Sequence, residues 1–379
     1  MKKAAGTPHL LHVFSTFVPA GPEMRTVRMI NALGESYRHS ILAIDDRTDA
    51  QTEFDATAPV RILPGLPRAG TASTVSALRR LIRREQPDLL LSYNWGAFDS
   101  VFASRSLYRG NRHLHHEDGF NADEADSFKS RRVWTRRLLL PGVARTVVPS
   151  EVLMGVATKT WKLKPKHIQL IPNGIDLDSF TERDGNPALR AELGISPETP
   201  VIGFVGHLRP VKNTQRLLRA FAAVRCDPMP ELVMLGEGEE REAIAKAAIA
   251  LNIQDRLHLV GHKSDTAPWY RLMDLFAISS DSEQMPVALL EAMATSLPVV
   301  STGVGDVAHM LCADQAPFVS AGAPSSWESQ LTSGFEKMIA SVAQRQTLGK
   351  ANRERVEEHY SFDSMLESYR TLYDSILGN

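Results

Sequence analysis

The sequence alternates short apolar runs with amphipathic segments, and this alternation constrains the fold more than any other feature. In the first half, runs of strand length cover residues 10–14, 39–44, 60–63, 88–92, 113–116, 146–148 and 168–171. Helical spacing of apolar residues covers residues 24–33, 74–84 and 98–108 between them. Strands that alternate with helices predict βαβ units, whose parallel strands form a doubly wound sheet.

The same alternation restarts after a polar break at residues 181–200, which is rich in Gly, Pro and Asp. Strand-like runs follow at residues 201–205, 232–235, 257–260, 275–278 and 298–301, with helical spacing at residues 214–224, 241–251 and 287–294. A length of 379 residues also suits two domains. We therefore predict an α/β protein with two Rossmann-like domains at residues 1–178 and 179–358, and a C-terminal helix at 359–379 that packs back on the first domain. Ligands bind such sheets at the carboxyl ends of the strands, so we expect the site in the crevice between the domains.

Composition excludes several other classes of protein. With 43% hydrophobic and 23% charged residues, the chain can bury a sizeable core, and no apolar run approaches the roughly 18 residues of a membrane span. Pro8, His9 and His12 interrupt the only candidate for a secretory signal. Cys226 and Cys312 form neither a disulfide framework nor a CxxC pair. We therefore expect a cytoplasmic protein.

Charge is distributed unevenly along the chain. Residues 1–178 carry 25 Lys and Arg against 18 Asp and Glu, a net charge of +7, whereas the remaining residues carry −8. Much of the excess lies in two clusters, at residues 79–84 and 129–137. Such asymmetry indicates an anionic partner for the first half, although a solvated helix face is the plain alternative for each cluster.

The most specific segment covers residues 279–306 and carries Glu283 and Glu291. Pro286 suits the start of a helix, which would place Glu283 in the preceding loop and Glu291 within the helix. The free N–H groups at a helix start attract anions, and a carboxylate can accept hydrogen bonds from two neighbouring sugar hydroxyls. This segment therefore predicts a site for a diphosphate flanked by sugars.

With this segment, the chain resembles the family 4 glycosyltransferases, which are retaining enzymes of the GT-B fold that use a nucleotide-diphosphate sugar. The resemblance covers nearly the whole chain. Further matching segments are residues 148–150, 171–176, 203–213 and 235–238.

The resemblance implies donor-site roles for particular residues. Lys212 matches a lysine that neutralises the donor diphosphate, while His207 stands where the family has an arginine, so Arg209 is expected to supply that charge. Glu283 is expected to orient the donor sugar and Glu291 to hold the ribose. Gln284 and Met285 replace the family's usual glycine and aromatic residue, which leaves the donor sugar open. The implied donor-binding set is completed by Gly21, Gly206, Gly261, His262, Pro286 and Val287.

In the first domain, His116 and Asp118 fit the family's contact to the transferred sugar or acceptor. The segment at residues 113–119 also invites a metal interpretation, since it holds three histidines and two acids. However, His113 and His115 share one face of a strand while His116 faces the other way, and no second ligand cluster completes a site. We therefore expect no metal or other cofactor, and a structural role remains open for His113. A simple strand-to-helix turn remains open for Gly21.

The sequence thus predicts a retaining glycosyltransferase that moves a sugar from a UDP- or GDP-sugar to a lipid or lipid-linked glycan acceptor. Expected catalytic residues are Glu283, His116, Asp118 and Lys212. Two alternatives are a GT-B sugar-nucleotide epimerase and a non-catalytic sugar-nucleotide-binding protein. Serine hydrolases, P-loop enzymes and dehydrogenases are disfavoured because the GxSxG, Walker and GxGxxG motifs are missing, and we expect no nucleic-acid partner.

The basic clusters lead to a further expectation, peripheral binding to the inner face of an anionic membrane. Basic residues beside Trp134 and a leucine run are typical of an interfacial helix. Packing of these leucines in the core is the alternative. The predicted membrane or acceptor residues are Arg79, Arg80, Arg83, Arg84, Arg131, Arg132, Trp134, Arg136 and Arg137.

Overall fold

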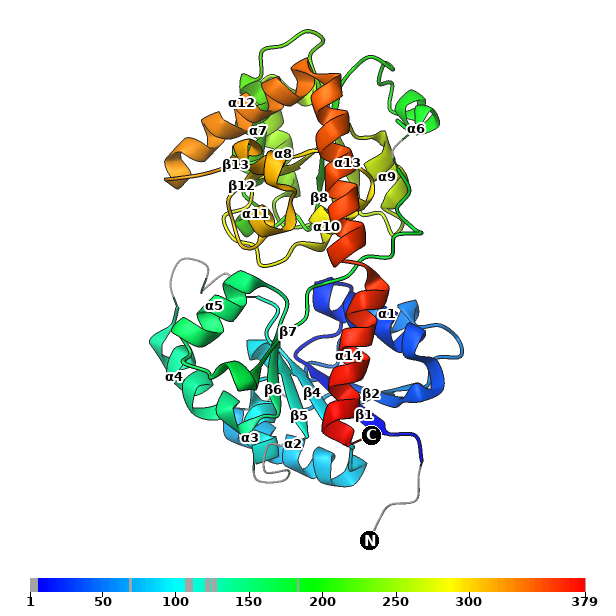
Figure 1. Cartoon of the computed structure of the whole chain (residues 1–379), viewed down its shortest axis with the longest axis vertical. Helices are drawn as coiled ribbons and strands as arrows, with labels where there is room; N and C mark the ends of the chain where they lie inside the picture. Colours follow the sequence, from blue (N-terminus) through cyan, green and yellow to red (C-terminus); the bar gives the residue numbers. More distant parts are fainter. Residues whose placement is uncertain are drawn as a thin grey trace. The chain divides into compact units, whose positions relative to one another are not determined.

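The computed structural model describes residues 6–67, 70–105, 112–119, 124, 128–182 and 184–378, which divide into two compact units. The first unit contains the described residues up to Asn173 together with those from Met365 onward (Figure 1). The second unit is Gly174–Ser364. Each unit contains a parallel sheet with helices, so the predicted α/β fold class is confirmed.

The first unit contains a seven-stranded parallel sheet in the order β3-β2-β1-β4-β5-β6-β7. All seven predicted strands are present, with ends shifted by a residue or so. Their buried apolar runs explain this agreement, since strands covered on both faces lack polar alternation. The strands are β1 (His9–Phe14), β2 (Arg38–Ala43), β3 (Val60–Leu63), β4 (Leu89–Tyr93), β5 (His113–His116), β6 (Arg145–Val148) and β7 (Ile168–Leu170).

Helices connect these strands. They are α1 (Gly21–Leu33), α2 (Thr71–Glu85), α3 (Asp99–Arg105), α4 (Ser130–Leu139) and α5 (Glu151–Lys159), while α14 (Phe362–Leu377) follows the second unit and connects no strands. The α2 helix ends at Glu85, because the next residue, Gln86, has a left-handed backbone conformation and precedes Pro87. From Met365 onward, α14 belongs to the first unit, and the Tyr37 hydroxyl donates to Asp374 Oδ1 of this helix at 2.7 Å.

The second unit contains a six-stranded parallel sheet in the order β10-β9-β8-β11-β12-β13. Five of the strands were predicted, while the two-residue β13 was not. The strands are β8 (Val201–Val205), β9 (Glu231–Leu235), β10 (Leu257–Gly261), β11 (Leu275–Ile278), β12 (Val299–Thr302) and β13 (Val319–Ser320).

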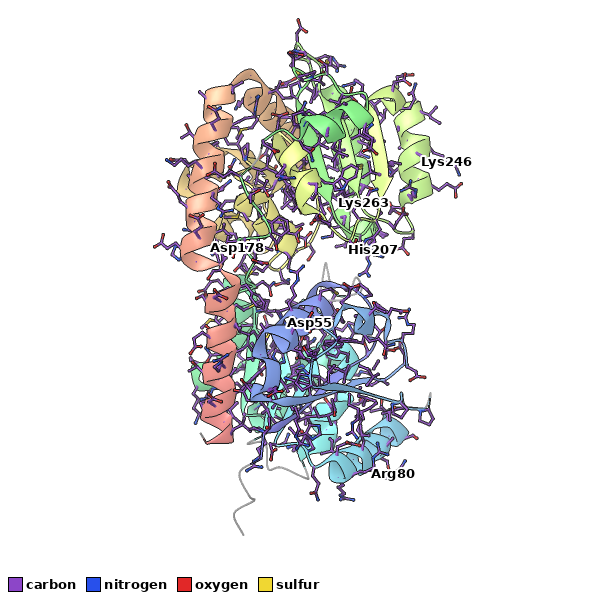
Figure 2. The ribbon with its side chains drawn as sticks, turned by 90° about the vertical axis from the view of Figure 1, so that its right-hand side faces the viewer. Asp55, Arg80, Asp178, His207, Lys246 and Lys263 are labelled. Atoms are coloured by element: carbon purple, nitrogen blue, oxygen red, sulfur yellow. The ribbon has the colours of Figure 1, made fainter. Side chains whose placement is uncertain are left out.

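Helices cover both faces of the second sheet. Along β9, Val233 and Leu235 pack in one core with side chains of α9 and α10, while Leu232 and Met234 pack in another with α7, α8 and α12. This alternation is what a doubly covered sheet requires. The helices are α6 (Pro187–Glu192), α7 (Thr214–Ala223), α8 (Arg241–Ala250), α9 (Ala267–Leu272), α10 (Val287–Ala294), α11 (Val307–Met310), α12 (Trp327–Ala340) and α13 (Val342–His359). Figure 2 shows Lys246 on the outer side of α8.

Within the described part of the chain, no helix is both long enough and apolar enough to cross a membrane. Cys226 and Cys312 are free thiols, and burial raises the pKa of both.

Candidate active site

In the second unit, a partly buried ion pair joins the loops that follow β8 and β11. These strands are neighbours at the point where the strand order reverses direction. Lys212 Nζ donates to Glu283 Oε1 at 2.6 Å, and the Ser280 hydroxyl donates to the same oxygen at 2.7 Å. The Lys212 and Glu283 side chains are 24% and 12% exposed. Ligands of open α/β sheets bind at this reversal, so the pair occupies the expected place for a charged ligand.

The second predicted carboxylate, Glu291, lies in the second turn of α10 and is buried. The Tyr270 hydroxyl donates to Glu291 Oε2 at 2.8 Å and lies 3.1 Å from the Ala288 carbonyl oxygen. Burial, together with Glu291, raises the pKa of Tyr270 well above its ordinary value, so the hydroxyl keeps its proton. Sequence reasoning missed Tyr270 because its partner lies on another helix.

Close backbone packing shapes the loops around this ion pair. Gly305 has a φ of +53°, and a Cβ there would lie 2.4 Å from the Glu283 carbonyl oxygen. At Gly236, with a φ of +138°, a Cβ would lie 1.9 Å from the Gly206 carbonyl oxygen. Only glycine fits either position. The backbone at Gly305 therefore packs directly on the loop after β11, and the loops after β8 and β9 pack directly on each other.

The remaining predicted donor residues of the second unit lie in these loops, at the end of β10 or at the start of α10. Pro286 caps α10 and Val287 begins it, whereas the Met285 side chain packs in the hydrophobic core. His207, Arg209 and His262 are exposed. Partial burial, and then Arg209, lower the pKa of His207, so this imidazole is neutral at pH 7. Gly261 ends β10, its carbonyl accepts from the Gly236 N–H at 2.9 Å, and Gln284 is half-buried.

In the first unit, polar side chains gather where β4, β5 and β7 end. Arg25 from α1 donates through Nη1 to Asp118 Oδ1 at 2.6 Å and to Asn173 Oδ1 at 2.8 Å. The Asp118 N–H donates to Asn94 Oδ1 at 2.7 Å. Among the described residues, Arg25 Nη2 and Asp118 Oδ2 are buried without a partner. This cluster can therefore still accept and donate hydrogen bonds.

Arg25, Asn94 and Asn173 were not predicted as site residues. Asn173 stands within residues 171–176, which the resemblance already singled out, but its contact with Arg25 joins residues far apart in sequence. Gly21 is the first residue of α1, and a Cβ there would meet no atom within 4 Å. The local fold therefore does not require a glycine at that position.

His116 lies beside this cluster within a stack of rings. Its ring centroid is 4.5 Å from that of Tyr93 and 5.9 Å from that of Tyr369. Burial, and next Arg25, lower the pKa of His116 well below its ordinary value, so the imidazole is neutral. Its Nε2 is buried and has no partner among the described residues.

The other two histidines of β5 lie on the opposite face, as predicted. His113 Nε2 and His115 Nδ1 both lie 2.8 Å from the Ser92 hydroxyl, and His113 Nδ1 is 2.7 Å from the Ser104 hydroxyl. These contacts support the structural role that was left open for His113. The described side chains include no group of three or more His, Cys, Asp or Glu that could hold a metal ion.

The structure corrects the prediction for the basic cluster on α4. Arg136 is buried rather than exposed, with Nε 2.6 Å from Glu117 Oε1 and its guanidinium about 5 Å from the ring centres of Trp95 and Trp161. Arg132 is also largely covered, and it pairs with Glu124 at 2.8 Å. Leu140 is buried too. The prediction that Arg136 meets lipid phosphates is therefore wrong, because this side chain neutralises a buried carboxylate.

Other members of the basic clusters do lie at the surface. Arg131, Trp134 and Leu138 are exposed, while Arg137 lies over the Trp134 ring at 4.9 Å. On α2, Arg80, Arg83 and Arg84 are exposed and Arg79 is half-buried, and Figure 2 shows Arg80 on the outer side of this helix.

Family profiles match both halves of the chain. The profile described as "Glycosyltransferase Family 4" matches residues 19–179, and that described as "Glycosyl transferases group 1" matches residues 186–355. A D-inositol 3-phosphate glycosyltransferase of Segniliparus rotundus is 32% identical over 238 residues, or 60% of this chain and 52% of that protein. An N-acetyl-alpha-D-glucosaminyl L-malate synthase of Bacillus anthracis is 27% identical over 239 residues, which are 62% of this chain and 61% of that protein. The chain thus spans about half to three-fifths of these curated relatives.

Solved structures show the same fold. Sucrose-phosphate synthase from Thermosynechococcus elongatus superposes with a TM-score of 0.80 at 18% identity, covering 98% of this chain and 99% of that one. The Anabaena protein HepE, solved in complex with UDP, superposes with a TM-score of 0.81 at 16% identity, covering 97% of this chain and 100% of that one. At this level of identity, the likeness establishes architecture alone.

Proposed function

Because the chain belongs to the family 4 glycosyltransferases, with their GT-B fold, we propose that it transfers a sugar from a nucleotide-diphosphate sugar to an acceptor hydroxyl with retention. A UDP- or GDP-sugar is the proposed donor, and a lipid or lipid-linked glycan in cell-surface glycan biosynthesis is the proposed acceptor. The names of the two curated relatives specify D-inositol 3-phosphate and L-malate, so small polar acceptors belong in the test. Complexes of HepE with UDP and UDP-glucose favour a uridine donor.

The observation that carries this proposal is the Lys212–Glu283 pair at the strand-order reversal of the second sheet. In the proposed reaction, Lys212 pairs with the donor diphosphate instead of Glu283, and the Glu283 carboxylate then orients the sugar. Arg209 and the N–H groups at the start of α10 add positive charge toward the leaving diphosphate. These groups supply the stabilisation that a metal ion gives elsewhere, so the proposed reaction needs no metal. Glu291 holds the ribose.

The first unit is proposed to bind the acceptor. The Arg25–Asp118 cluster and the neutral His116 offer both donors and acceptors to sugar hydroxyls. The acceptor hydroxyl attacks the anomeric carbon as the bond to the diphosphate breaks on the same face. The departing phosphate oxygen takes the hydroxyl proton, so no protein nucleophile is needed.

We also propose that the protein binds peripherally to the inner face of an anionic membrane. The exposed Trp134 and Leu138, at 58% and 65%, lie four residues apart on α4 with Arg131 nearby. Aromatic and aliphatic side chains beside basic residues are typical of interfacial helices.

A donor screen tests the proposed function. UDP-, GDP- and ADP-sugars are incubated with the protein, with and without lipid-linked and small hydroxyl acceptors, and nucleotide release is measured in chelator. We expect release to require acceptor, to survive chelation and to be lost in Lys212→Ala. The anomeric configuration of the product, read by NMR, decides retention. Donor turnover without acceptor would indicate an epimerase, and binding without turnover would indicate a non-catalytic protein.

A further inference from the structure

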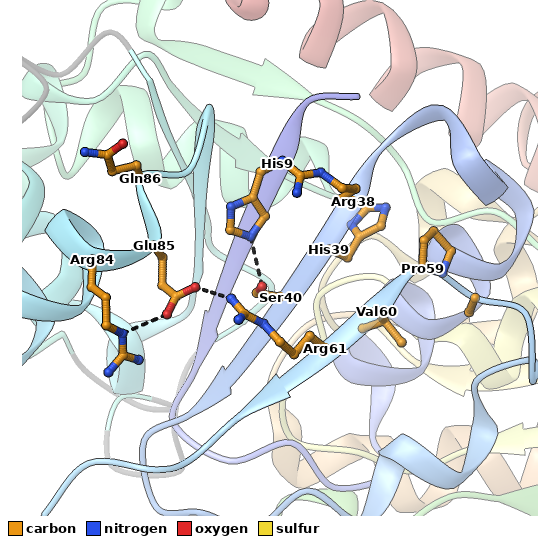
Figure 3. A pocket seen from close by; sticks show the side chains of 11 residues that line it. His9, Arg38, His39, Ser40, Pro59, Val60, Arg61, Arg84, Glu85 and Gln86 are labelled. Atoms are coloured by element: carbon orange, nitrogen blue, oxygen red, sulfur yellow. Dashed lines mark hydrogen bonds and ion pairs between the residues drawn. The ribbon is translucent and has the colours of Figure 1, made fainter. Parts of the chain in front are cut away.

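A cavity of about 620 Å³ lies in the first unit at the end of the sheet where β1, β2 and β3 begin (Figure 3). The Arg25–Asp118 cluster lies beyond the opposite ends of the strands, so the cavity is separate from the candidate active site. Small-molecule sites commonly have volumes of roughly 300–1,000 Å³. Its lining includes His9, Arg38, Ser40, Arg61, Arg84 and Glu85.

Positive charge exceeds negative charge around this cavity. Among the described residues that line it, Glu85 is the only acidic one, against three arginines. The Glu85 carboxylate accepts hydrogen bonds from both Arg61 and Arg84, the latter at 2.9 Å (Figure 3). Its single negative charge neutralises only one of these two guanidinium groups. Arg38 donates through Nε to the Thr7 carbonyl at 3.3 Å, and no carboxylate pairs with it in the described part of the chain. The lining therefore carries a net charge of about +2.

His9 and Ser40 form a buried polar contact in the wall of the cavity. They are 8% and 2% exposed, and His9 Nε2 lies 2.8 Å from the Ser40 hydroxyl. Burial, and then Arg38, lower the pKa of His9, with a further contribution from Arg61. The imidazole therefore experiences the field of the arginines.

We propose that this cavity binds a phosphomonoester, with Arg38 and Arg61 as the main phosphate contacts. A guanidinium presents parallel N–H groups that match two phosphate oxygens. A phosphomonoester carries a charge near −2 at pH 7, which balances the lining, whereas the phosphodiester of a common lipid carries only −1. This site is additional to the proposed transferase function, and its test uses neither donor nor acceptor, so the two can fail separately.

The test is a titration of the full chain with inorganic phosphate, followed by NMR of histidine-labelled protein. The His9 signal is assigned with a His9→Asn variant. We expect a saturable shift of this signal. Arg38→Ala and Arg61→Ala should each weaken binding about tenfold or more, because each removes a charged hydrogen bond. Arg80→Ala is the matched control, since Arg80 is exposed on α2 outside the lining, and it should leave binding unchanged.

The decisive variant is one that should bind phosphate more tightly, because misfolding would weaken binding rather than strengthen it. Glu85→Gln removes the carboxylate that competes for Arg61 and Arg84, and it should tighten phosphate binding severalfold. Absence of a saturable His9 shift, or equal weakening by Arg80→Ala, would overturn the proposal. Vesicles of phosphatidylcholine and phosphatidylglycerol form the second arm. A His9 shift with these vesicles but not with phosphate would replace the phosphomonoester by a lipid headgroup.

Discussion

Lys212 and His207 follow the same strand, but their charges at neutral pH differ. Lys212 is a cation paired with Glu283, whereas His207 has a lowered pKa and is neutral. Lys212→Ala should therefore reduce turnover and donor affinity more than His207→Ala, since only the lysine supplies a fixed charge to a diphosphate. Steady-state kinetics with the donor found in the screen provides the measurement. If His207→Ala costs more, the histidine has taken over the role of the missing arginine.

Glu283 and Glu291 should separate donor turnover from donor binding. Glu291→Ala should weaken nucleotide binding by about 1–3 kcal/mol through loss of the proposed ribose contact, while Glu283→Ala mainly lowers turnover. Calorimetry with the free nucleotide and initial rates give the two quantities. Tyr270→Phe is the control, because it removes the hydroxyl bonded to Glu291 and keeps the carboxylate. An equal loss of nucleotide affinity in Tyr270→Phe would assign the effect to local packing instead.

At the scale of elements, the buried Arg136 anchors α4, although Trp134 and Leu138 of the same helix are exposed. Arg136→Ala leaves the Glu117 carboxylate buried without its main counter-ion, which typically lowers the free energy of unfolding by about 3–5 kcal/mol. Arg131→Ala, an exposed residue on the same helix, should change it by less than about 0.5 kcal/mol. Urea unfolding compares the two variants. A similar small effect in both would show that Glu117 is stabilised by other groups.

The histidines of β1 and β2 make the first unit sensitive to acid. Burial, and next His9, lower the pKa of His39 to about 4, and His12, whose Nε2 is 3.0 Å from His39 Nδ1, is also held neutral by burial. Unfolded histidine takes up a proton below a pH of about 6.5, so stability is lost as pH falls from there toward 4. His39 alone should contribute about 3 kcal/mol to this loss. Denaturant unfolding should show that the free energy of unfolding of His39→Gln depends less steeply on pH across this range than that of the unmodified protein. An equally steep dependence would contradict the role given to His39.

The elements that the sequence predicted best are those whose pattern is local. The strand β1 is a short apolar run, and α2 ends before a proline, so adjacent residues decide both. The strand β13 has two residues, too few for any periodicity. The burial of Arg136 depends on Glu117 and on two tryptophans from other segments. The Arg25 contacts to Asp118 and Asn173 likewise exist only once β5 and β7 lie in the same sheet.

At the scale of the molecule, the charge difference between the two halves predicts salt-sensitive binding to anionic vesicles. Each basic residue near such a surface contributes about 1 kcal/mol, so the triple variant Arg80→Glu, Arg83→Glu and Arg131→Glu should lose most of the binding. Sedimentation with phosphatidylglycerol vesicles measures it. Trp134→Ser should also weaken binding, whereas Ile249→Ser, an equally exposed apolar residue of the second unit, should not. Equal binding to neutral vesicles would contradict the membrane proposal.

The first unit is built from two pieces of chain that are separated by the entire second unit. A ribosome therefore completes all seven strands of the first sheet, and then the whole second sheet, before it makes α14. Until then His116 lacks the ring of Tyr369, and Tyr37 lacks Asp374. Domains usually fold as units while the chain is being made, with the earlier one first. In this protein the second unit can finish folding first, and the nascent first unit must stay soluble until α14 has been made.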